Sequence, residues 1–186
     1  MDFWKFLDSL IARDKRGEST EEIFAAAAPM FEKTFQAYLP KAPAECLLEM
    51  NEIRIAYLAA LNADDPESCL AYMEPYRNLR FRVDLETQYP DIRWREAELR
   101  LKVVQVGPQD VILPTEYELA PIIEKLFAAL KRDPSLQMEL LRQPTLSPDE
   151  YKAYCDVQIA FYRAIARLPC DEAVLMLRDV YRPTDA

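Results

Sequence analysis

Residues 28–38 read APMFEKTFQAY, and residues 120–130 read APIIEKLFAAL. Six of these eleven aligned positions are identical, and three more are apolar in both copies. A recurring stretch of this kind indicates an internal duplication, which decides how the rest of the chain is interpreted. The identical pairs are Ala28/Ala120, Pro29/Pro121, Glu32/Glu124, Lys33/Lys125, Phe35/Phe127 and Ala37/Ala129.

Further matches follow in the same order. Residues 53–61, IRIAYLAAL, resemble residues 157–165, VQIAFYRAI. The offset between copies grows from 92 at the first match to 104 at the second, so we predict an insertion near residues 133–144. The sequence thus predicts two tandem pseudo-repeated units, residues 1–77 and 91–182, joined by a connector at 78–90. Both units would pack as one helical bundle-like domain spanning residues 1–186.

The predicted fold class is all-α, because the local signals are those of helices. Only two glycines occur, whereas turn-rich strand proteins use many. Apolar residues recur at helical spacing. Ser19, followed by Glu21 and Glu22, is typical of a helix start, and so is Ser147 before Pro148. Pro29 and Pro121 fall inside apparent helices and should kink them or mark new starts.

One region leaves a β element open. Residues 79–86, LRFRVDLE, alternate apolar and charged side chains with a period of two, and VVQV follows at 103–106. Such alternation is typical of strands. A small β hairpin in the connector region around residues 79–113 is therefore an alternative to helix or extended chain.

The charge of the chain bears on its partners. The net charge is −9, so nucleic acid and anionic membrane surfaces are disfavoured and a basic protein partner is favoured. No stretch approaches the ~20 apolar residues that span a bilayer. The N-terminal MDFWKFLDSL carries three charged residues within its apolar run, which is not typical of a secretory signal. We therefore expect a cytoplasmic protein.

The chain shows no catalytic, cofactor-binding or metal-binding signature. It has no histidine, its four cysteines form no CxxC pair, and two glycines cannot build a phosphate loop. Helix geometry would separate Cys46 from Cys69 by roughly 24 Å, too far for a disulfide. A bond between the two units stays open, but we expect reduced thiols.

We predict a protein–protein interaction module, such as an adaptor, a regulator or an inhibitor. A toxin-neutralising, immunity-type protein would fit the size and charge by analogy. The alternative is a small-molecule or lipid-binding protein with an apolar pocket at the seam between the units; an enzyme is less favoured. Tyrosine, arginine and tryptophan are common in interface hot spots. The interaction candidates are Tyr72, Tyr76, Arg77, Tyr181, Arg182 and Trp94.

Overall fold

The computed structural model describes residues 3–74, 81 and 83–183, and it is all-α in this part of the chain, with no strand. Within these described residues, nine α-helices are joined by turns and short 3-10 segments, among them η1 (Leu39–Lys41), η3 (Met138–Arg142) and η4 (Pro148–Glu150). The helices are α1 (Phe3–Lys15), α2 (Thr20–Tyr38), α3 (Ala44–Asp64), α4 (Pro66–Met73), α5 (Leu85–Gln88), α6 (Pro90–Val106), α7 (Glu116–Leu130), α8 (Tyr151–Ile165) and α9 (Cys170–Val180).

Helix starts follow local side-chain chemistry. Ser19 caps α2 through a reciprocal pair of hydrogen bonds with Glu22, as the sequence predicts. Ser147 makes the same pair with Glu150, although one 3-10 turn precedes α8 there. Thr115 caps α7 in the same way. These carboxylates satisfy backbone N–H groups that the first helical turn leaves without partners.

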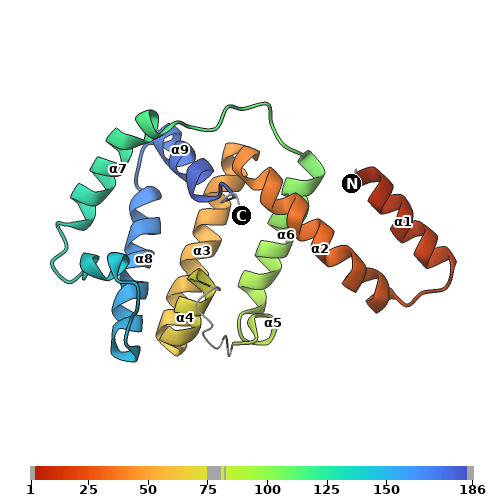
Figure 1. Cartoon of the computed structure of the whole chain (residues 1–186), viewed down its shortest axis with the longest axis horizontal. Helices are drawn as coiled ribbons and strands as arrows, with labels where there is room; N and C mark the ends of the chain where they lie inside the picture. Colours follow the sequence, from red (N-terminus) through yellow and green to blue (C-terminus); the bar gives the residue numbers. More distant parts are fainter. Residues whose placement is uncertain (1–2, 75–80, 82, 184–186) are drawn as a thin grey trace.

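Helix α3 lies at the centre of the domain. It packs against α4, α6, α8 and α9, and Figure 1 shows α8, α3 and α6 side by side. Buried side chains occupy most of its circumference, which is typical of a helix surrounded by others. Its largest fully buried side chains are Leu47, Ile53, Tyr57, Leu58 and Leu61.

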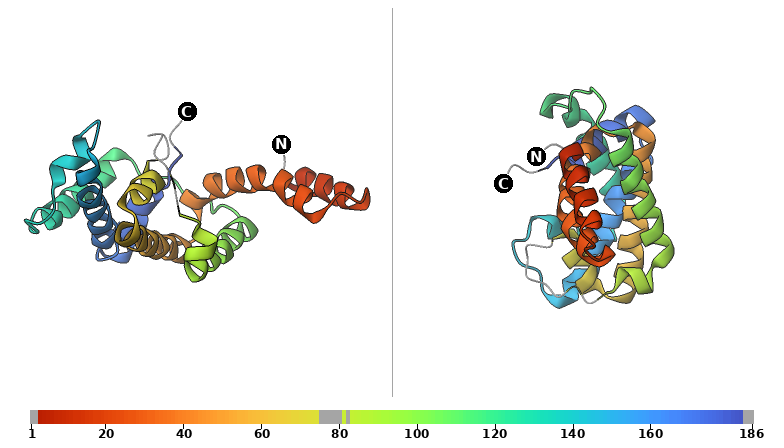
Figure 2. Two further views of the ribbon diagram at one scale, coloured as in Figure 1. Left: turned by 90° about the horizontal axis from the view of Figure 1, so that it is seen from below. Right: turned by 90° about the vertical axis from the view of Figure 1, so that its right-hand side faces the viewer.

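The two short helices α4 and α9 both pack on α3 and α8. Outside this centre, α7 packs on α8 and α9, while α2 crosses α6. Helix α1 folds back on α2, and this helical hairpin extends away from the rest of the domain (Figure 2). Pro29 and Pro121 lie inside α2 and α7, which continue past them as single helices and do not restart there.

The predicted duplication stays a hypothesis. Helix order favours it, because α1 to α4 precede the 78–90 connector with its short α5, and α6 to α9 follow. The packing of the helices supports the duplication less than their order does. Helix α6 packs on α3, whereas its counterpart α1 packs on α2. The two proline-containing helices also have different neighbours, since α2 lies against α6 and α7 lies against α8 and α9.

The β hairpin that the alternating pattern suggested around 79–113 is not formed by the described residues. The VVQV stretch is the last turn of α6, where Leu99, Val103 and Val104 are buried at helical spacing. Gly107 ends this helix with a positive φ of 75°, a conformation that glycine adopts at low cost. Residues 79, 80 and 82 lie outside the described part of the chain.

A disulfide joins Cys69 of α4 to Cys155 of α8, with Cα atoms 6.4 Å apart. The expectation of four reduced cysteines is therefore wrong for this pair. Sequence reasoning could estimate distances only within one helical hairpin, whereas α4 packs across the predicted unit boundary onto α8. Cys46 and Cys170 are free thiols, and they pair neither with each other nor with the bonded cysteines.

Candidate functional site

Three of the predicted interaction residues meet in one place. Tyr72, Tyr181 and Arg182 line the same pocket, although they come from opposite units of the sequence. Trp94 is not part of it; its side chain is 68% exposed on the outer side of α6. Tyr76 and Arg77 lie outside the described residues. The pocket therefore unites half of the predicted set, and we refer to it as the seam pocket.

The seam pocket has a volume of about 290 Å³. Its walls come from α2, α3, α4, α6 and the end of α9, so both predicted units contribute to it. This volume suits a small molecule, since sites for drug-sized ligands span roughly 300–1,000 Å³. The lining residues are Glu32, Phe35, Gln36, Leu39, Met50, Arg54, Tyr72, Glu96, Arg100, Val180, Tyr181, Arg182 and Pro183.

Arg54, on the central helix α3, dominates the chemistry of the pocket. Its Nη1 donates a hydrogen bond to the Tyr162 hydroxyl at 3.0 Å. Its guanidinium lies 5.4 Å from the ring centre of Tyr162 and 5.2 Å from that of Tyr181, which is cation–π geometry. Its Nε is buried and has no hydrogen-bond partner in the part of the chain that the structure describes. Among the described residues, no carboxylate forms an ion pair with Arg54.

Arg100, on α6, gives the contrasting case within the same pocket. It binds Glu96 at 2.7 Å, forms an ion pair with Glu32, and stacks over the Phe35 ring at 4.6 Å. Glu96 is only 3% exposed and also binds Arg93 at 3.1 Å. Both carboxylates that line the pocket are thus bound by Arg100. A buried charge is stable when it is paired in this way, and Arg54 lacks such a partner.

The tyrosines supply neutral hydroxyl groups. Burial raises the pKa of Tyr181 and the pKa of Tyr72 above the ordinary tyrosine value, while the nearby Arg54 charge works against this shift. Both hydroxyls are therefore protonated at neutral pH. The Tyr181 hydroxyl is buried without a hydrogen-bond partner. The pocket wall thus holds two unused donors, the Tyr181 O–H and the Arg54 Nε–H.

Arg182 has a structural role in this arrangement. Its Nη2 donates a hydrogen bond to the Pro114 carbonyl at 2.6 Å and lies 3.3 Å from Asp179. These contacts fasten the end of α9 to the loop before α7, which keeps Tyr181 against the pocket. The sequence suggested Arg182 as an interaction residue, and the structure places it in the pocket wall.

Sequence reasoning missed Arg54, Arg100 and Glu96. A signal for Arg54 was present, because it interrupts the apolar stretch IRIAYLAAL. The duplication aligns Arg54 with Gln158. The charge of Arg54 is therefore not a feature that the two units share. An arginine that is absent from the other copy and lies in a buried helix points to a local role. No comparable signal marked Glu96, whose burial depends on the packing of α6.

Within the described residues, no group of three or more cysteine, aspartate or glutamate side chains is placed to hold a metal ion. None of the described helices combines the length and the apolar character needed to cross a membrane. A scan of protein-family models finds no family that matches the chain, and comparison with curated proteins and with solved structures yields no significant match either.

Proposed function

We propose that this protein binds a small organic anion in the seam pocket, with Arg54 as the counter-ion of the ligand. The observation that carries the proposal is a buried guanidinium whose Nε has no partner. A buried cation without a carboxylate partner is costly, because the contacts with tyrosine compensate for only part of its lost hydration. A bound carboxylate or phosphate would provide that compensation.

The arrangement of donors supports an oxyanion. Arginine presents a planar set of N–H groups that suits carboxylate and phosphate oxygens. Here Nη1 is held by Tyr162, which fixes the plane of the guanidinium, and the buried Nε–H has no partner among the described residues. The Tyr181 hydroxyl can donate a second hydrogen bond to the same anion. Phe35, Leu39 and Met50 offer apolar contact for the body of the ligand.

This proposal corresponds to the small-molecule alternative at the seam, with a more polar pocket than the sequence predicted. The interaction module remains a second candidate function, favoured by large side chains that the structure leaves in solvent. Phe24 on α2 is 69% exposed, and Trp94 lies on the outer side of α6. The predicted basic partner stays a prediction.

The location of the protein is also a matter for proposal. Disulfides are rare in the reducing cytosol and common in oxidising compartments. The Cys69–Cys155 bond therefore favours an oxidising compartment over the cytoplasm that the sequence predicted.

The experiment is a binding screen with defined anions. Inorganic phosphate, citrate, succinate, benzoate and a sugar phosphate are each added to the purified chain, and hits from thermal unfolding are measured by titration calorimetry. The test variant is Arg54→Met. The control is Arg142→Met, because Arg142 is exposed on η3 and lines neither the seam pocket nor its rim.

We expect at least one organic anion to raise the unfolding temperature of the wild type and of Arg142→Met, but not of Arg54→Met. A ligand at 100 times its Kd would stabilise the fold by about 2.7 kcal/mol. The proposal is wrong if no anion binds, or if the anions that bind do so equally well to Arg54→Met.

A further inference from the structure

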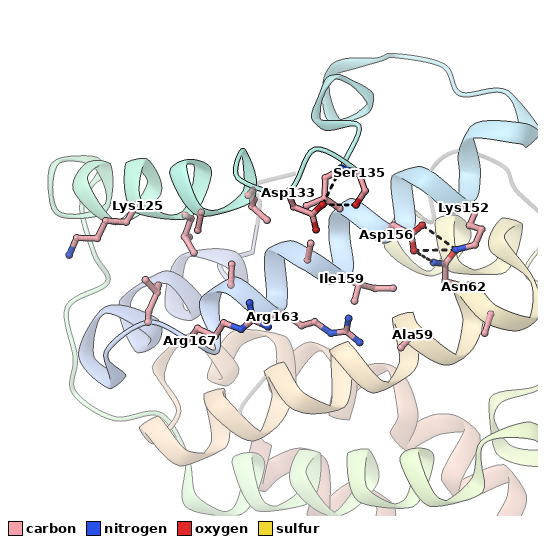
Figure 3. A pocket seen from close by; sticks show the side chains of 18 residues that line it. Ala59, Asn62, Lys125, Asp133, Ser135, Lys152, Asp156, Ile159, Arg163 and Arg167 are labelled. Carbon is pink, nitrogen blue, oxygen red and sulfur yellow. Dashed lines mark hydrogen bonds and ion pairs between the residues drawn. The ribbon is translucent and has the colours of Figure 1, made fainter.

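A larger groove lies between α7 and α8, on the other side of α3 from Glu96 and Arg100. It has a volume of about 720 Å³ and is bounded by α7, α8, the end of α3 and the turn at residues 133–136 (Figure 3). Part of its wall is the segment at which the two predicted units differ in length, residues 133–144. Both predicted units contribute to its wall, and the 133–136 turn has no counterpart in the first unit; we refer to it as the α7–α8 groove.

Small apolar side chains form one part of the groove lining, which we call its floor. Ala59, Ala129, Ala160 and Ala164 contribute from three helices, and Leu126 and Ile159 lie among them. Small residues allow another helix backbone to approach closely, as they do wherever helices pack at short distance. A floor of this kind suits a helix better than it suits a bulky aromatic ligand.

The charged side chains that line the groove are four cations and the two carboxylates Asp133 and Asp156, although the chain as a whole carries a charge of −9. Lys125 and Lys152 lie near its opposite ends (Figure 3), and their charges are paired with Glu172 and Asp156. Arg163 and Arg167 also line the groove, and neither forms an ion pair with another described residue. The local charge of this surface therefore has the opposite sign to the net charge.

Arg163 lies in the last turn of α8, and Arg167 lies in the turn that follows the end of this helix at Ile165. Their place near the C-terminal end of α8 is favoured by the helix dipole, which alone would stabilise cations there. The dipole does not account for their position beside an alanine-lined groove. Two neighbouring guanidinium groups can each bind a carboxylate of one partner segment.

The length of the groove favours an extended occupant. Lys152 and Arg163 both belong to α8 and are eleven residues apart, which corresponds to roughly 17 Å along the helix axis. A partner helix of about three to four turns would cover this distance. A single small anion would contact only one end of the groove.

We propose that the α7–α8 groove docks an acidic amphipathic helix of a partner protein. Its small and apolar residues would face the alanine floor, and its aspartate or glutamate side chains would meet Arg163 and Arg167. The inference is independent of the seam pocket. It gives the predicted interaction module a specific surface. The partner would be acidic at this surface, whereas the net charge of the chain suggested a basic partner.

The probe is a designed 15-residue helical peptide, labelled with fluorescein, with alanine and leucine on one face and glutamate on the other. Two peptides serve as controls: one carries lysine in place of glutamate, and one has the same composition in a scrambled order that removes the apolar face. Fluorescence anisotropy at 20 mM and 200 mM salt gives the affinities. We expect the acidic amphipathic peptide to bind at least about tenfold more tightly than either control, and more weakly at high salt.

Two pairs of variants test the location. Ala129→Trp fills the groove, whereas Ala128→Trp changes the adjacent exposed residue of α7, which does not line it. The double variant Arg163→Glu, Arg167→Glu reverses the free charges. Lys33→Glu, Lys41→Glu makes the same charge change at exposed positions elsewhere. We expect roughly tenfold weaker peptide binding for Ala129→Trp and for the arginine pair, and unchanged binding for both controls.

Circular dichroism and the unfolding midpoint establish that each variant is folded before binding is compared. Equal binding to Ala129→Trp and Ala128→Trp would overturn the proposal, and so would the absence of any preference for the acidic peptide. Sedimentation of the wild type and of Ala129→Trp tests whether a second copy of this chain occupies the groove. A dimer that forms in the wild type and is lost in Ala129→Trp would assign the groove to a second copy of this chain, and would overturn the proposal as well.

Discussion

Arg54 Nη1 donates a hydrogen bond to the Tyr162 hydroxyl at 3.0 Å, while Nε of the same guanidinium has no partner. The contact links α3 of the first predicted unit to α8 of the second. It holds the arginine in place without neutralising it, because a tyrosine hydroxyl is uncharged at neutral pH. We therefore expect Arg54 to lower the stability of the ligand-free chain, whereas the proposed ligand binding requires it.

Replacing Arg54 with methionine should cost the ligand-free protein little. Methionine retains much of the side-chain volume and removes a buried charge that no carboxylate compensates. We expect the free energy of unfolding, measured by urea titration, to stay within about 1 kcal/mol of the wild type or to rise. A loss above about 3 kcal/mol would show that the two tyrosine rings stabilise the guanidinium fully, and would argue for a purely structural role.

Arg100→Met should behave in the opposite way. Among the described residues, the substitution removes one of the two cations that form ion pairs with Glu96, and Arg93 stays as the other ion-pair partner of this nearly inaccessible carboxylate. We expect unfolding to become easier by about 2–3 kcal/mol, again by urea titration. Arg95→Met is the matched control, because Arg95 pairs with Glu49 and Glu52 at the surface and should contribute less than about 1 kcal/mol. Equal effects of the two substitutions would contradict this prediction.

The sequence predicted the fold class because its signals are local. Serine caps, prolines in first turns and helical spacing of apolar residues all act within a few residues, and the structure contains the helix starts at Ser19 and Ser147 that they indicate. The alternating stretch near Val83 suggested a strand that the described residues do not form. A period of two over eight residues also fits an extended segment beside short helices. Local patterns do not specify which helices become neighbours.

The candidate site depended on those neighbours. Tyr72 and Tyr181 were chosen for residue type, and their meeting follows from the packing of α4 and α9 on α3. Cys69 and Cys155 could not be paired in advance for the same reason. Arg54 was not among the predicted site residues, because its lack of a carboxylate partner is a property of the folded chain.

The Cys69–Cys155 disulfide should contribute much of the stability. The bond closes a loop with a sequence separation of 86, and the chain-entropy account gives about 4–5 kcal/mol for such a loop. The variant Cys69→Ala, Cys155→Ala should lose this amount in urea unfolding. Cys170→Ser, which changes an exposed free thiol, should lose less than about 0.5 kcal/mol.

Thiol titration of the denatured, unreduced chain checks the bond directly. Two of the four cysteines should react, and all four should react after reduction. Four reactive thiols without reduction, in protein prepared under oxidising conditions, would contradict the disulfide and with it the proposed compartment.

The buried tyrosines predict a loss of stability at alkaline pH. Burial raises the pKa of Tyr72 and Tyr181 in the folded chain, whereas the unfolded chain has the ordinary value of about 10. The unfolded state therefore releases these protons first as the pH rises. The resulting stabilisation of the fold is complete below pH 10 and is lost progressively above it.

Urea unfolding between pH 8 and pH 11 measures the decline. Burial also raises the pKa of Tyr57 and Tyr89, so Tyr181→Phe removes one of several such groups and should decline less steeply, while Tyr117→Phe, at a 90% exposed position, should follow the wild type. Identical slopes for Tyr181→Phe and the wild type would show that Tyr181 ionises equally readily in both states, which would contradict its burial as a neutral donor beside Arg54.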